Sequence, residues 1–513
     1  MPFLESLGID ILSQYTMLAF TAMFLFACLL IKNGIVRAFV ATIGAVFIVA
    51  QIFSLYSTQT FIGYQFYIHA NIRDVDGMQG IFLKQIIVFG SLAVVLWVVF
   101  FFSYRLVQWI LRRANRWERF AAMEMCALLL VVMCGLVILQ GNFIRDTKTL
   151  LPLFASKHSD DFRAVLERYG MGDYVSPEHI EAITDGRNVI VISMESMEKN
   201  ILLCPDSLTP NLNRLKNEWH TIDIYPNEGS SWTSGSLYTS LTGFPAEFGI
   251  GGNQIFHTAV HSNISSIVDV FRKNDYRTIF LIGNAEFSGT RSILTTFHFD
   301  EIVDYLWASD TCLLTDVGLH DRDLFALAKT KIEEQLSRGK PFFMFISTTD
   351  SHFPDGIVDP KMQGVVAPRN NGFDFCVSVL DYVVGDFIDY LRRRRVIDNT
   401  TIFLYPDHLK MGTPPTCGDP NDRRLYVISN SVSLPKPQKR LYQIDIPHII
   451  LQGAGVRHNL RFLTDYIADD DKSRWIEQHL TPLTEINTSG IVRDSNILVE
   501  GDSVTSTRGA IVR

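Results

Sequence analysis

The sequence lacks the surplus of basic residues that nucleic-acid-binding proteins usually carry. Its 513 residues include 46 Lys and Arg against 54 Asp and Glu, which gives a formal net charge of −8. A nucleic-acid partner is therefore not expected. The first ten residues, MPFLESLGID, also lack the basic start of a cleaved signal peptide, so we expect none. No internal repeat or low-complexity tract stands out, which argues against a repeat architecture.

Charged residues are nearly absent from four long apolar stretches in the first quarter of the chain. Each stretch has about 20 residues, the length that a helix needs to cross the hydrocarbon core of a membrane. The stretches cover residues 11–31, 38–56, 86–104 and 121–139. A buried core helix has a similar composition, but four such stretches in a row favour membrane spans. Residues 1–144 are therefore predicted to form a transmembrane region of four helices.

The basic residues between these stretches predict how the chain is oriented. Lys32 and Arg37 flank the first connection, and the third connection, residues 105–119, is rich in arginine. Positively charged connections remain in the cytoplasm. The part of the chain after about residue 140 is then expected to face the periplasm or the exterior. This pattern predicts a multi-pass protein of a bacterial inner (cytoplasmic) membrane.

The remainder of the chain reads as an α/β domain. Short apolar, β-branched runs, such as RNVIVISM at 187–194, alternate with helix-like segments, such as FDFCVSVLDYVVGDFIDYLRRRR. This alternation predicts a mostly parallel sheet over residues 187–456, in which ligands bind beyond the carboxyl ends of the strands. Residues 145–186 are expected to be a linker with short helices. Residues 457–513 are expected to be a C-terminal extension packed on the catalytic domain.

Acidic and imidazole side chains follow three of the predicted strands. Glu195 ends VIVISMES, Asp350 and His352 follow FFMFIST, and Asp407 and His408 follow TIFLYP. Any one of these residues alone could be a helix cap, a surface acid or a core histidine. Together, at one edge of a sheet, they favour a divalent metal or catalytic site. By side-chain type alone, Mn²⁺, Mg²⁺ and Zn²⁺ all remain open.

A hydroxyl-rich segment, NEGSSWTSGSLYTSLTGFPAE at 227–247, runs into a helix-like pattern. The first turn of a helix offers unpaired N–H groups and the positive end of the dipole, which favour a developing negative charge. A bound cation lowers the pKa of a hydroxyl further. Hydroxyls at helix starts are more often simple caps. The pattern alone does not choose among Ser230, Ser231, Thr233, Ser234 and Ser236.

Four cysteines lie outside the apolar stretches, at positions 204, 312, 376 and 417. In an oxidising compartment they could form two disulfides in any of three pairings. Unpaired, buried thiols fit the sequence equally well. Cys204, Cys312, Cys376 and Cys417 therefore remain unassigned at this point.

Several of these segments together resemble a known group of enzymes. NVIVISMES, SSWTSGSLYTSLTGFP, TTDSHFPDG and GDFIDYLRRRRVIDNTTIFLYPDHLKM occur in this order. They are similar to the membrane-anchored branch of the alkaline phosphatase/sulfatase superfamily. That branch includes lipoteichoic acid synthases, phosphoethanolamine transferases and the phosphoglycerol transferases that modify periplasmic glucans. The resemblance covers roughly residues 186–455 and implies a sulfatase-like α/β/α sandwich.

The resemblance implies a metal site with a threonine nucleophile. Glu195 matches the family's acid after the first strand, and Asp407 with His408 matches its Asp-His metal pair. Thr233 matches the nucleophile, which is also a metal ligand. The resemblance favours Mn²⁺ as the single divalent ion, with Mg²⁺ and Zn²⁺ as alternatives.

The resemblance also implies residues that bind the substrate. His352 and Arg291 match positions that contact the phospholipid head group in the family. Asp350, beside His352, and Trp232, beside Thr233, are two further expected substrate contacts.

The implied activity is transfer of a phosphoglycerol head group from phosphatidylglycerol to a glycan. A covalent phospho-threonine forms on the way, and diacylglycerol is released. The alternatives are a phosphoethanolamine transferase, a phosphodiester hydrolase, and a membrane protein that binds glycans without catalysis. Ile282 and Leu409 depart from the lipoteichoic acid and ethanolamine types, respectively. Cys204, in LCPDSL, lacks the context that a sulfatase nucleophile needs.

Overall fold

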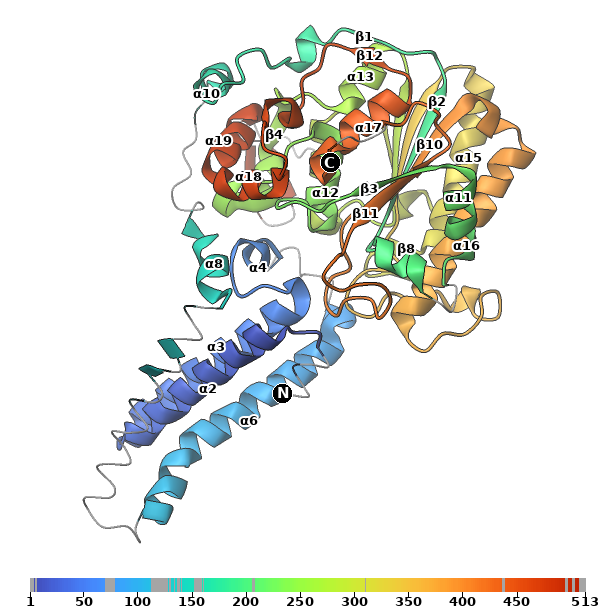
Figure 1. Cartoon of the computed structure of the whole chain (residues 1–513). Helices are drawn as coiled ribbons and strands as arrows, with labels where there is room; N and C mark the ends of the chain where they lie inside the picture. The colour runs from blue at the N-terminus through green and yellow to red at the C-terminus, as the bar shows by residue number, and fades with distance from the viewer. Residues whose placement is uncertain are drawn as a thin grey trace. The chain divides into compact units, whose positions relative to one another are not determined.

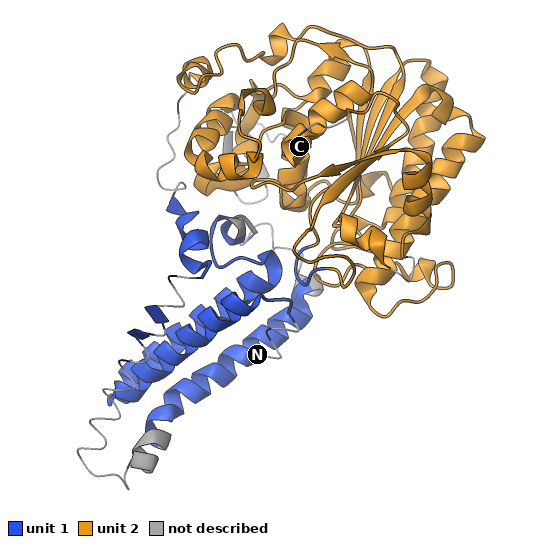
Figure 2. Ribbon diagram, in the orientation of Figure 1, with its two compact units in different colours: residues 1–151, 411–414 blue, residues 152–410, 415–513 orange. Residues whose placement is uncertain are grey.

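The computed structural model divides into two compact units, residues 1–151 with 411–414 and residues 152–410 with 415–513 (Figure 2). Apart from isolated positions elsewhere, the described residues are 7–69, 79–111, 141–151, 161–204, 208–309, 311–435, 439–493, 497–500 and 503–506.

The first unit is built from helices, of which the three longest in the described part of the chain are apolar (Figure 1). They are α2 (Ile11–Leu30), α3 (Gly34–Thr58), α4 (Tyr64–His69), α6 (Gln79–Leu111) and α8 (Phe143–Lys148). The long helices pack on one another through aromatic rings, such as buried Phe20 against partly buried Phe47 at 5.2 Å between ring centroids. Large apolar side chains also face outward, since Ile35 is 83% exposed and Phe39 is 67% exposed. Apolar surface of this extent suits contact with lipid.

Three helices in the described part of the chain are long and apolar enough to cross a membrane. They are Ile11–Leu30, Gly34–Thr58 and Phe82–Arg105. These helices coincide with the first three predicted spans. The fourth predicted span, 121–139, lies mostly outside the described residues.

The second unit is organised around a seven-stranded sheet with the order β3-β11-β10-β2-β9-β5-β6 (Figure 1). The strands are β2 (Asn188–Met194), β3 (His220–Ile224), β5 (Arg277–Ile282), β6 (Glu301–Val303), β9 (Phe342–Ser347), β10 (Thr400–Pro406) and β11 (Leu425–Ser429). Neighbours from β10 to β6 pair in parallel, and β11 pairs antiparallel with both β10 and β3. The α/β fold with a mostly parallel sheet, predicted for residues 187–456, is confirmed.

Helices cover both faces of this sheet (Figure 1). One face carries α11 (Pro210–Glu218), α15 (Asp321–Arg338) and α16 (Gly372–Arg393), and the other carries α12 (Thr233–Thr242), α13 (Ile267–Lys273) and α17 (Ile446–Gly453). Ile190 and Ile192 of β2 belong to the same core cluster as Leu380 of α16. On the other face, Phe343 of β9 stacks on Phe271 of α13 with 4.4 Å between ring centroids. Burial on both faces explains why the central strands are continuous apolar runs.

Smaller elements complete the second unit. The helices are α10 (Phe162–Arg168), α14 (Thr290–Thr296), α18 (Lys472–Gln478) and α19 (Leu480–Gly490). The short strand pairs are β1 (Ala182–Ile183) with β12 (Arg457–His458), β4 (Ala259–Ser262) with β13 (Ile491–Arg493), β7 (Leu314–Thr315) with β8 (Gly318–Leu319), and β14 (Ile497–Glu500) with β15 (Ser503–Ser506). Asn487 of α19 accepts a hydrogen bond from the Tyr238 hydroxyl at 2.9 Å and donates to the Pro245 carbonyl at 2.8 Å. The C-terminal segment thus packs directly behind α12.

Candidate active site

Two neighbouring strands bring the acidic residues together. β2 and β10 pair in parallel with Pro406 opposite Met194, so Glu195 and Asp407 leave the sheet at the same edge. His408 follows directly, and its Nε2 lies 3.5 Å from Glu195 Oε1 and 3.4 Å from Asp407 Oδ2. All three side chains are buried, and their ligand atoms lie within 4.8 Å of one another. The spacing is that of residues able to share one metal ion.

Thr233 presents its hydroxyl to this cluster. It is the first residue of α12, and its Oγ1 donates a hydrogen bond to Glu195 Oε2 at 2.9 Å. The first N–H groups of a helix have no partner within the helix and carry the positive end of its dipole. Negative charge that develops on Thr233 Oγ1 is therefore stabilised by α12. The residue is half-buried, which leaves access for a substrate.

Neighbouring hydroxyls serve structural partners. Ser230 Oγ bonds to Thr239 Oγ1 at 2.8 Å. Ser236 Oγ donates to the backbone carbonyl of Asp407 at 2.6 Å. The hydroxyl of Thr233, by contrast, bonds to a carboxylate of the acidic cluster, which distinguishes it from these two serines.

Hydrogen bonds orient each member of the cluster. Asp407 Oδ1 accepts the backbone N–H groups of Ser196 at 2.8 Å and His408 at 2.7 Å. Glu195 Oε1 accepts the hydroxyl of Ser196 at 2.8 Å. His408 Nδ1 donates to the Leu409 carbonyl at 2.8 Å, so the lone pair of its ring lies on Nε2, the atom facing the two carboxylates.

The cluster fits a divalent cation. Asp407 Oδ2 is buried and has no hydrogen-bond partner among the described residues. Burial and the neighbouring Glu195 raise the pKa of Asp407 well above its usual range. Burial opposes ionisation of Glu195 as well, but His408 and His352 lower its pKa overall. A cation satisfies the orphaned oxygen and both carboxylates at once. Carboxylate and imidazole ligands are compatible with Mn²⁺, Mg²⁺ and Zn²⁺.

His352 lies in the loop after β9. Together with His408, it lowers the pKa of Glu195. Nδ1 donates to the Phe353 carbonyl at 2.6 Å, so Nε2 is available for another group. The ring meets Phe287 edge-on with 5.5 Å between centroids. This half-buried imidazole is therefore oriented by its own loop.

Arg291 lies in the first turn of α14. Its guanidinium is held by the carboxylates of Glu286 and Asp304. The Asp304 side chain is 1% exposed and the Glu286 side chain is 63% exposed. A phosphate group that binds Arg291 can more easily displace the exposed partner than the buried one.

Asp350 is engaged inside the protein. Its Oδ1 bonds to His320 Nδ1 at 2.8 Å, and its Oδ2 accepts the backbone N–H of Asp321 at 3.0 Å. Asp321 in turn accepts the backbone N–H of Thr349 at 2.8 Å. Because both oxygens of Asp350 are already bonded, we interpret this carboxylate as a support of the His352 loop and no longer as a substrate contact.

Trp232 immediately precedes α12 and is 5% exposed. A Cβ atom at Gly235 would lie 2.5 Å from its indole ring, so the ring packs against the first turn of the helix. A glycine at this position lets the indole approach the backbone closely. Trp232 therefore helps to hold the residue next to it, Thr233, in place.

Three supporting residues were not singled out from the sequence. Thr348 Oγ1 accepts the backbone N–H of Glu195 at 2.9 Å, and Ser351 Oγ donates to the Glu195 carbonyl at 2.6 Å. Both lie in the TTDSHFPDG motif, which was a usable signal. Gln443 donates to the Asp407 carbonyl at 2.7 Å, and no local sequence pattern marks it.

Among the described cysteines, one disulfide forms, between Cys204 and Cys417, with 5.1 Å between the Cα atoms. Cys312 and Cys376 are free, so the arrangement with two disulfides is wrong. The bridge ties the loop after Asp407 and His408 to the segment after β2. It also removes the Cys204 thiol from any role as a nucleophile.

Residues 187–456 match the family described as Sulfatase. The chain belongs to the sulfatase family. Phosphoglycerol transferase I of Citrobacter koseri is 27% identical over 247 residues, which cover 44% of this chain and 31% of that relative. Phosphoglycerol transferase I of Escherichia coli is 27% identical over 327 residues, covering 59% of this chain and 40% of that relative. The chain thus spans less than half the length of these relatives.

The chain also matches parts of solved structures. The lipoteichoic acid synthase LtaP from Listeria monocytogenes has a TM-score of 0.45 at 19% identity and covers 59% of this chain and 81% of its own. The integral membrane protein lipooligosaccharide phosphoethanolamine transferase A from Neisseria meningitidis has a TM-score of 0.47 at 11% identity. Its match covers 90% of this chain and 98% of its own.

Proposed function

We propose that this protein transfers a phosphoglycerol head group from phosphatidylglycerol to a glycan. The observation that carries the proposal is the Thr233 hydroxyl bonded to Glu195, in a cluster that contains the orphaned oxygen of Asp407. A hydroxyl beside a cation site is an activated nucleophile. The name of the relatives, phosphoglycerol transferase I, supports the choice of head group.

Glu195, Asp407 and His408, together with Thr233 Oγ1, would hold one divalent ion, with Mn²⁺ favoured. When bound, the ion lowers the pKa of a coordinated hydroxyl and neutralises charge on phosphoryl oxygens. The protein residues perform the remaining steps.

In the first step, Thr233 Oγ1 attacks the phosphorus atom of the lipid. Glu195 Oε2, 2.9 Å away, is placed to receive the hydroxyl proton. The bond between phosphorus and the diacylglycerol oxygen breaks, and the departing oxygen takes up a proton. Glycerol phosphate remains attached to Thr233 as a phosphodiester. The N-terminus of α12 stabilises the charge on the threonine oxygen throughout.

In the second step, a hydroxyl of the acceptor glycan attacks the same phosphorus atom. The bond between phosphorus and Thr233 Oγ1 breaks, and the threonine regains a proton. His352 and Arg291 would bind the phosphoryl oxygens or the glycerol unit during both steps. A glycan without such a hydroxyl would leave the enzyme in its phosphorylated form.

The three long apolar helices fit a lipid donor. A phospholipid head group lies at the membrane surface, so an enzyme that uses it gains by being anchored there. The proposed location is the inner membrane of a bacterium, with the catalytic unit in the periplasm or at the exterior.

Release of diacylglycerol from vesicles tests the first step. We expect the full chain with Mn²⁺ to release diacylglycerol from phosphatidylglycerol, Thr233→Ser to retain part of the rate, and Thr233→Ala to lose it. Chelation should stop the reaction, and added Mn²⁺ should restore it. Diacylglycerol release by Thr233→Ala at the wild-type rate would overturn the assignment of Thr233 as the nucleophile. Activity on phosphatidylethanolamine with none on phosphatidylglycerol would replace the proposal with a phosphoethanolamine transferase.

A further inference from the structure

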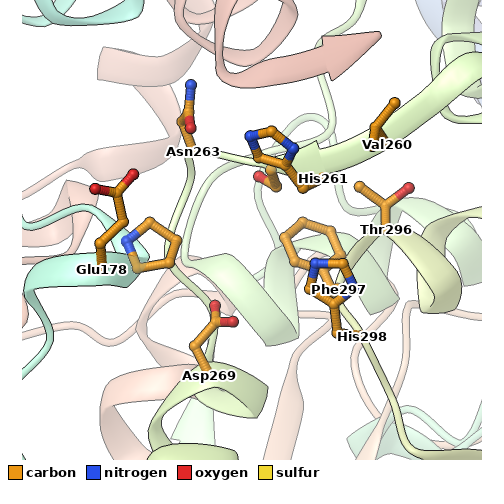
Figure 3. A pocket seen from close by; sticks show the side chains of 10 residues that line it. Glu178, Val260, His261, Asn263, Asp269, Thr296, Phe297 and His298 are labelled. Atoms are coloured by element: carbon orange, nitrogen blue, oxygen red, sulfur yellow. The ribbon is translucent and has the colours of Figure 1, made fainter. Parts of the chain in front are cut away.

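A pocket with both polar and apolar walls lies in the catalytic unit, and none of the proposed metal ligands lines it. It has a volume of about 410 Å³ and is formed by four separate segments (Figure 3). They are Pro177 with Glu178, the strand β4 with Asn263, Asp269 of α13, and Thr296 of α14 with the two residues that follow. None of the residues in this pocket takes part in the steps proposed above.

Polar groups in the pocket converge without satisfying one another. Among the described residues, the side chains of Glu178, His261, Asn263 and His298 make no hydrogen bond. Asp269 uses Oδ2 to accept the backbone N–H of Ser266 at 2.8 Å, which leaves Oδ1 for another group. Figure 3 shows the carboxylates of Glu178 and Asp269 on one side of the space and the imidazole of His298 on the other. Donors and acceptors thus surround the same space from different directions.

The chemistry of the lining excludes two classes of ligand. No lysine or arginine lines the pocket in the described part of the chain, so a phosphate or sulfate group has no charged partner there. Two carboxylates disfavour any anion further. A single metal ion is also a poor match, because the one metal-competent group among the described residues is that of Glu195, Asp407 and His408.

The remaining class is a neutral molecule with many hydroxyl groups. Each hydroxyl donates one hydrogen bond and accepts others, which suits carboxylate, amide and imidazole groups together. Burial and the nearby Arg272 lower the pKa of His298, so at neutral pH its ring offers one donor and one acceptor. Phe297, Val260 and Pro177 supply apolar surface for C–H groups. Ligand sites commonly combine such apolar walls with a few polar groups.

We propose that this pocket binds a sugar unit of the acceptor glycan. The inference rests on the proposed transfer to a glycan. Helix α14 connects the two places, because Arg291 lies in its first turn and Thr296, its last residue, lines the pocket. At a rise of about 1.5 Å per residue, these two positions are about 8 Å apart along the helix. A glycan held in the pocket would therefore extend its neighbouring units toward Arg291, the proposed phosphoryl contact.

Binding of a neutral gluco-oligosaccharide to the full chain tests the proposal. The protein is held in lipid nanodiscs, because glycoside detergents would compete for the pocket. Calorimetry compares wild type, Glu178→Ala/His261→Ala, and the matched control His179→Ala/Glu181→Ala. All four positions are exposed, so these changes should leave the fold intact. We expect the pocket variant to bind about tenfold more weakly, the effect of losing one or two hydrogen bonds, and the control to bind like wild type.

Two further measurements separate this proposal from the proposed reaction. Thr233→Ala should bind the oligosaccharide normally, and the pocket variant should release diacylglycerol at the wild-type rate when no acceptor is present. If the pocket variant binds the oligosaccharide as tightly as wild type, the proposed sugar site is wrong. Tighter binding of glycerol 3-phosphate than of the oligosaccharide would also overturn it. If Thr233→Ala still releases diacylglycerol while the pocket result holds, the transfer mechanism fails and the sugar site stands.

Discussion

At the residue scale, Asp407 gives the most direct argument that the cluster fits a cation. Its Oδ1 accepts two backbone N–H groups, while its buried Oδ2 has no hydrogen bond in the described part of the protein. An unpaired buried oxygen beside a second carboxylate, Glu195, costs stability unless a positive charge is present. Asp407 is therefore expected to weaken the metal-free fold in return for metal binding.

The substitution Asp407→Asn tests this expectation. The amide keeps the acceptor for both N–H groups and can donate to Glu195 in place of Oδ2. We expect the metal-free protein to gain about 1 kcal/mol of stability. The rise in the unfolding temperature on adding Mn²⁺ should shrink, and transfer should fall about a thousandfold, the scale of losing a charge-stabilising catalytic group.

Asp381→Asn is the matched control for this change. Asp381 is also buried, but its carboxylate accepts the backbone N–H groups of Leu212 at 2.8 Å and Asn211 at 3.0 Å. We expect this variant to lose about 1–3 kcal/mol with or without metal and to keep the Mn²⁺ effect. Equal destabilisation by both variants, with the Mn²⁺ effect intact in Asp407→Asn, would contradict the cation site.

At the element scale, the start of α15 fixes the loop that carries His352. The Asp350 carboxylate bonds to the His320 ring and accepts the backbone N–H of Asp321. In return, the Asp321 carboxylate accepts the backbone N–H of Thr349. Burial opposes the charged form of His320, but the hydrogen bond and the charge of Asp350 raise its pKa above 6.5. The protonated imidazole therefore stabilises the folded state.

The sign of the resulting pH effect follows from linkage. A group whose pKa is raised on folding adds its full contribution to the free energy of unfolding at pH values below its unfolded pKa. This contribution is lost as the pH rises through the pKa of the folded state. His320→Asn keeps a neutral donor to Asp350 but no charge. We expect the stability advantage of wild type over His320→Asn, measured by urea unfolding, to be larger at pH 6 than at pH 8.5. An advantage that grows with pH would contradict this account, and His220→Asn, at an exposed position, serves as the control.

The disulfide acts on the same scale, because it ties two segments that flank the metal ligands. Cys204 and Cys417 are separated by 213 residues in sequence, so the bond removes much freedom from the unfolded chain. We expect Cys204→Ala/Cys417→Ala to lose about 2–5 kcal/mol of stability in urea unfolding. Cys312→Ser, which removes a free thiol, should have little effect. A double variant as stable as wild type would show that the bridge does not constrain these segments.

The site residues at the strand ends could be predicted from the sequence for a physical reason. In a parallel sheet, residues that follow apolar runs leave at one edge, and β2 beside β10 brings Glu195 and Asp407 together in this way. The antiparallel direction of β11 could not be predicted from the sequence. Its segment, RLYVISN, has a pattern of apolar residues that fits a parallel or an antiparallel strand equally well. The role of Gln443 was equally hidden, since its contact with Asp407 depends on packing between distant segments.

At the scale of the whole molecule, the apolar helices and the catalytic unit together predict a membrane topology. We expect the full chain, expressed in a Gram-negative host, to remain in the membrane pellet after alkaline carbonate extraction. Protease added to spheroplasts should then digest the catalytic unit. The basic connections are expected to stay in the cytoplasm, which places the catalytic unit on the outer side of the membrane. A cytoplasmic marker enzyme should stay intact in the same preparation. A catalytic unit that is cut only after lysis would reverse the proposed orientation.

Fold class and membrane region were the parts of the whole molecule that composition could predict. Apolar stretches of membrane-spanning length and alternating strands and helices are both strong patterns. The pairing of cysteines was not predictable, because it depends on which distant segments meet. The sugar pocket was also not predictable, because its walls come from four separate segments between residues 177 and 298.

The central claim is that Thr233 carries the transferred group. The direct measurement is mass spectrometry of the peptide containing Thr233, after the full chain is incubated with phosphatidylglycerol vesicles and Mn²⁺ in the absence of a glycan. The account predicts a glycerol phosphate adduct on Thr233 that disappears when acceptor is added and never forms in Thr233→Ala. Diacylglycerol release with an unmodified Thr233, or an adduct on another residue, would contradict it.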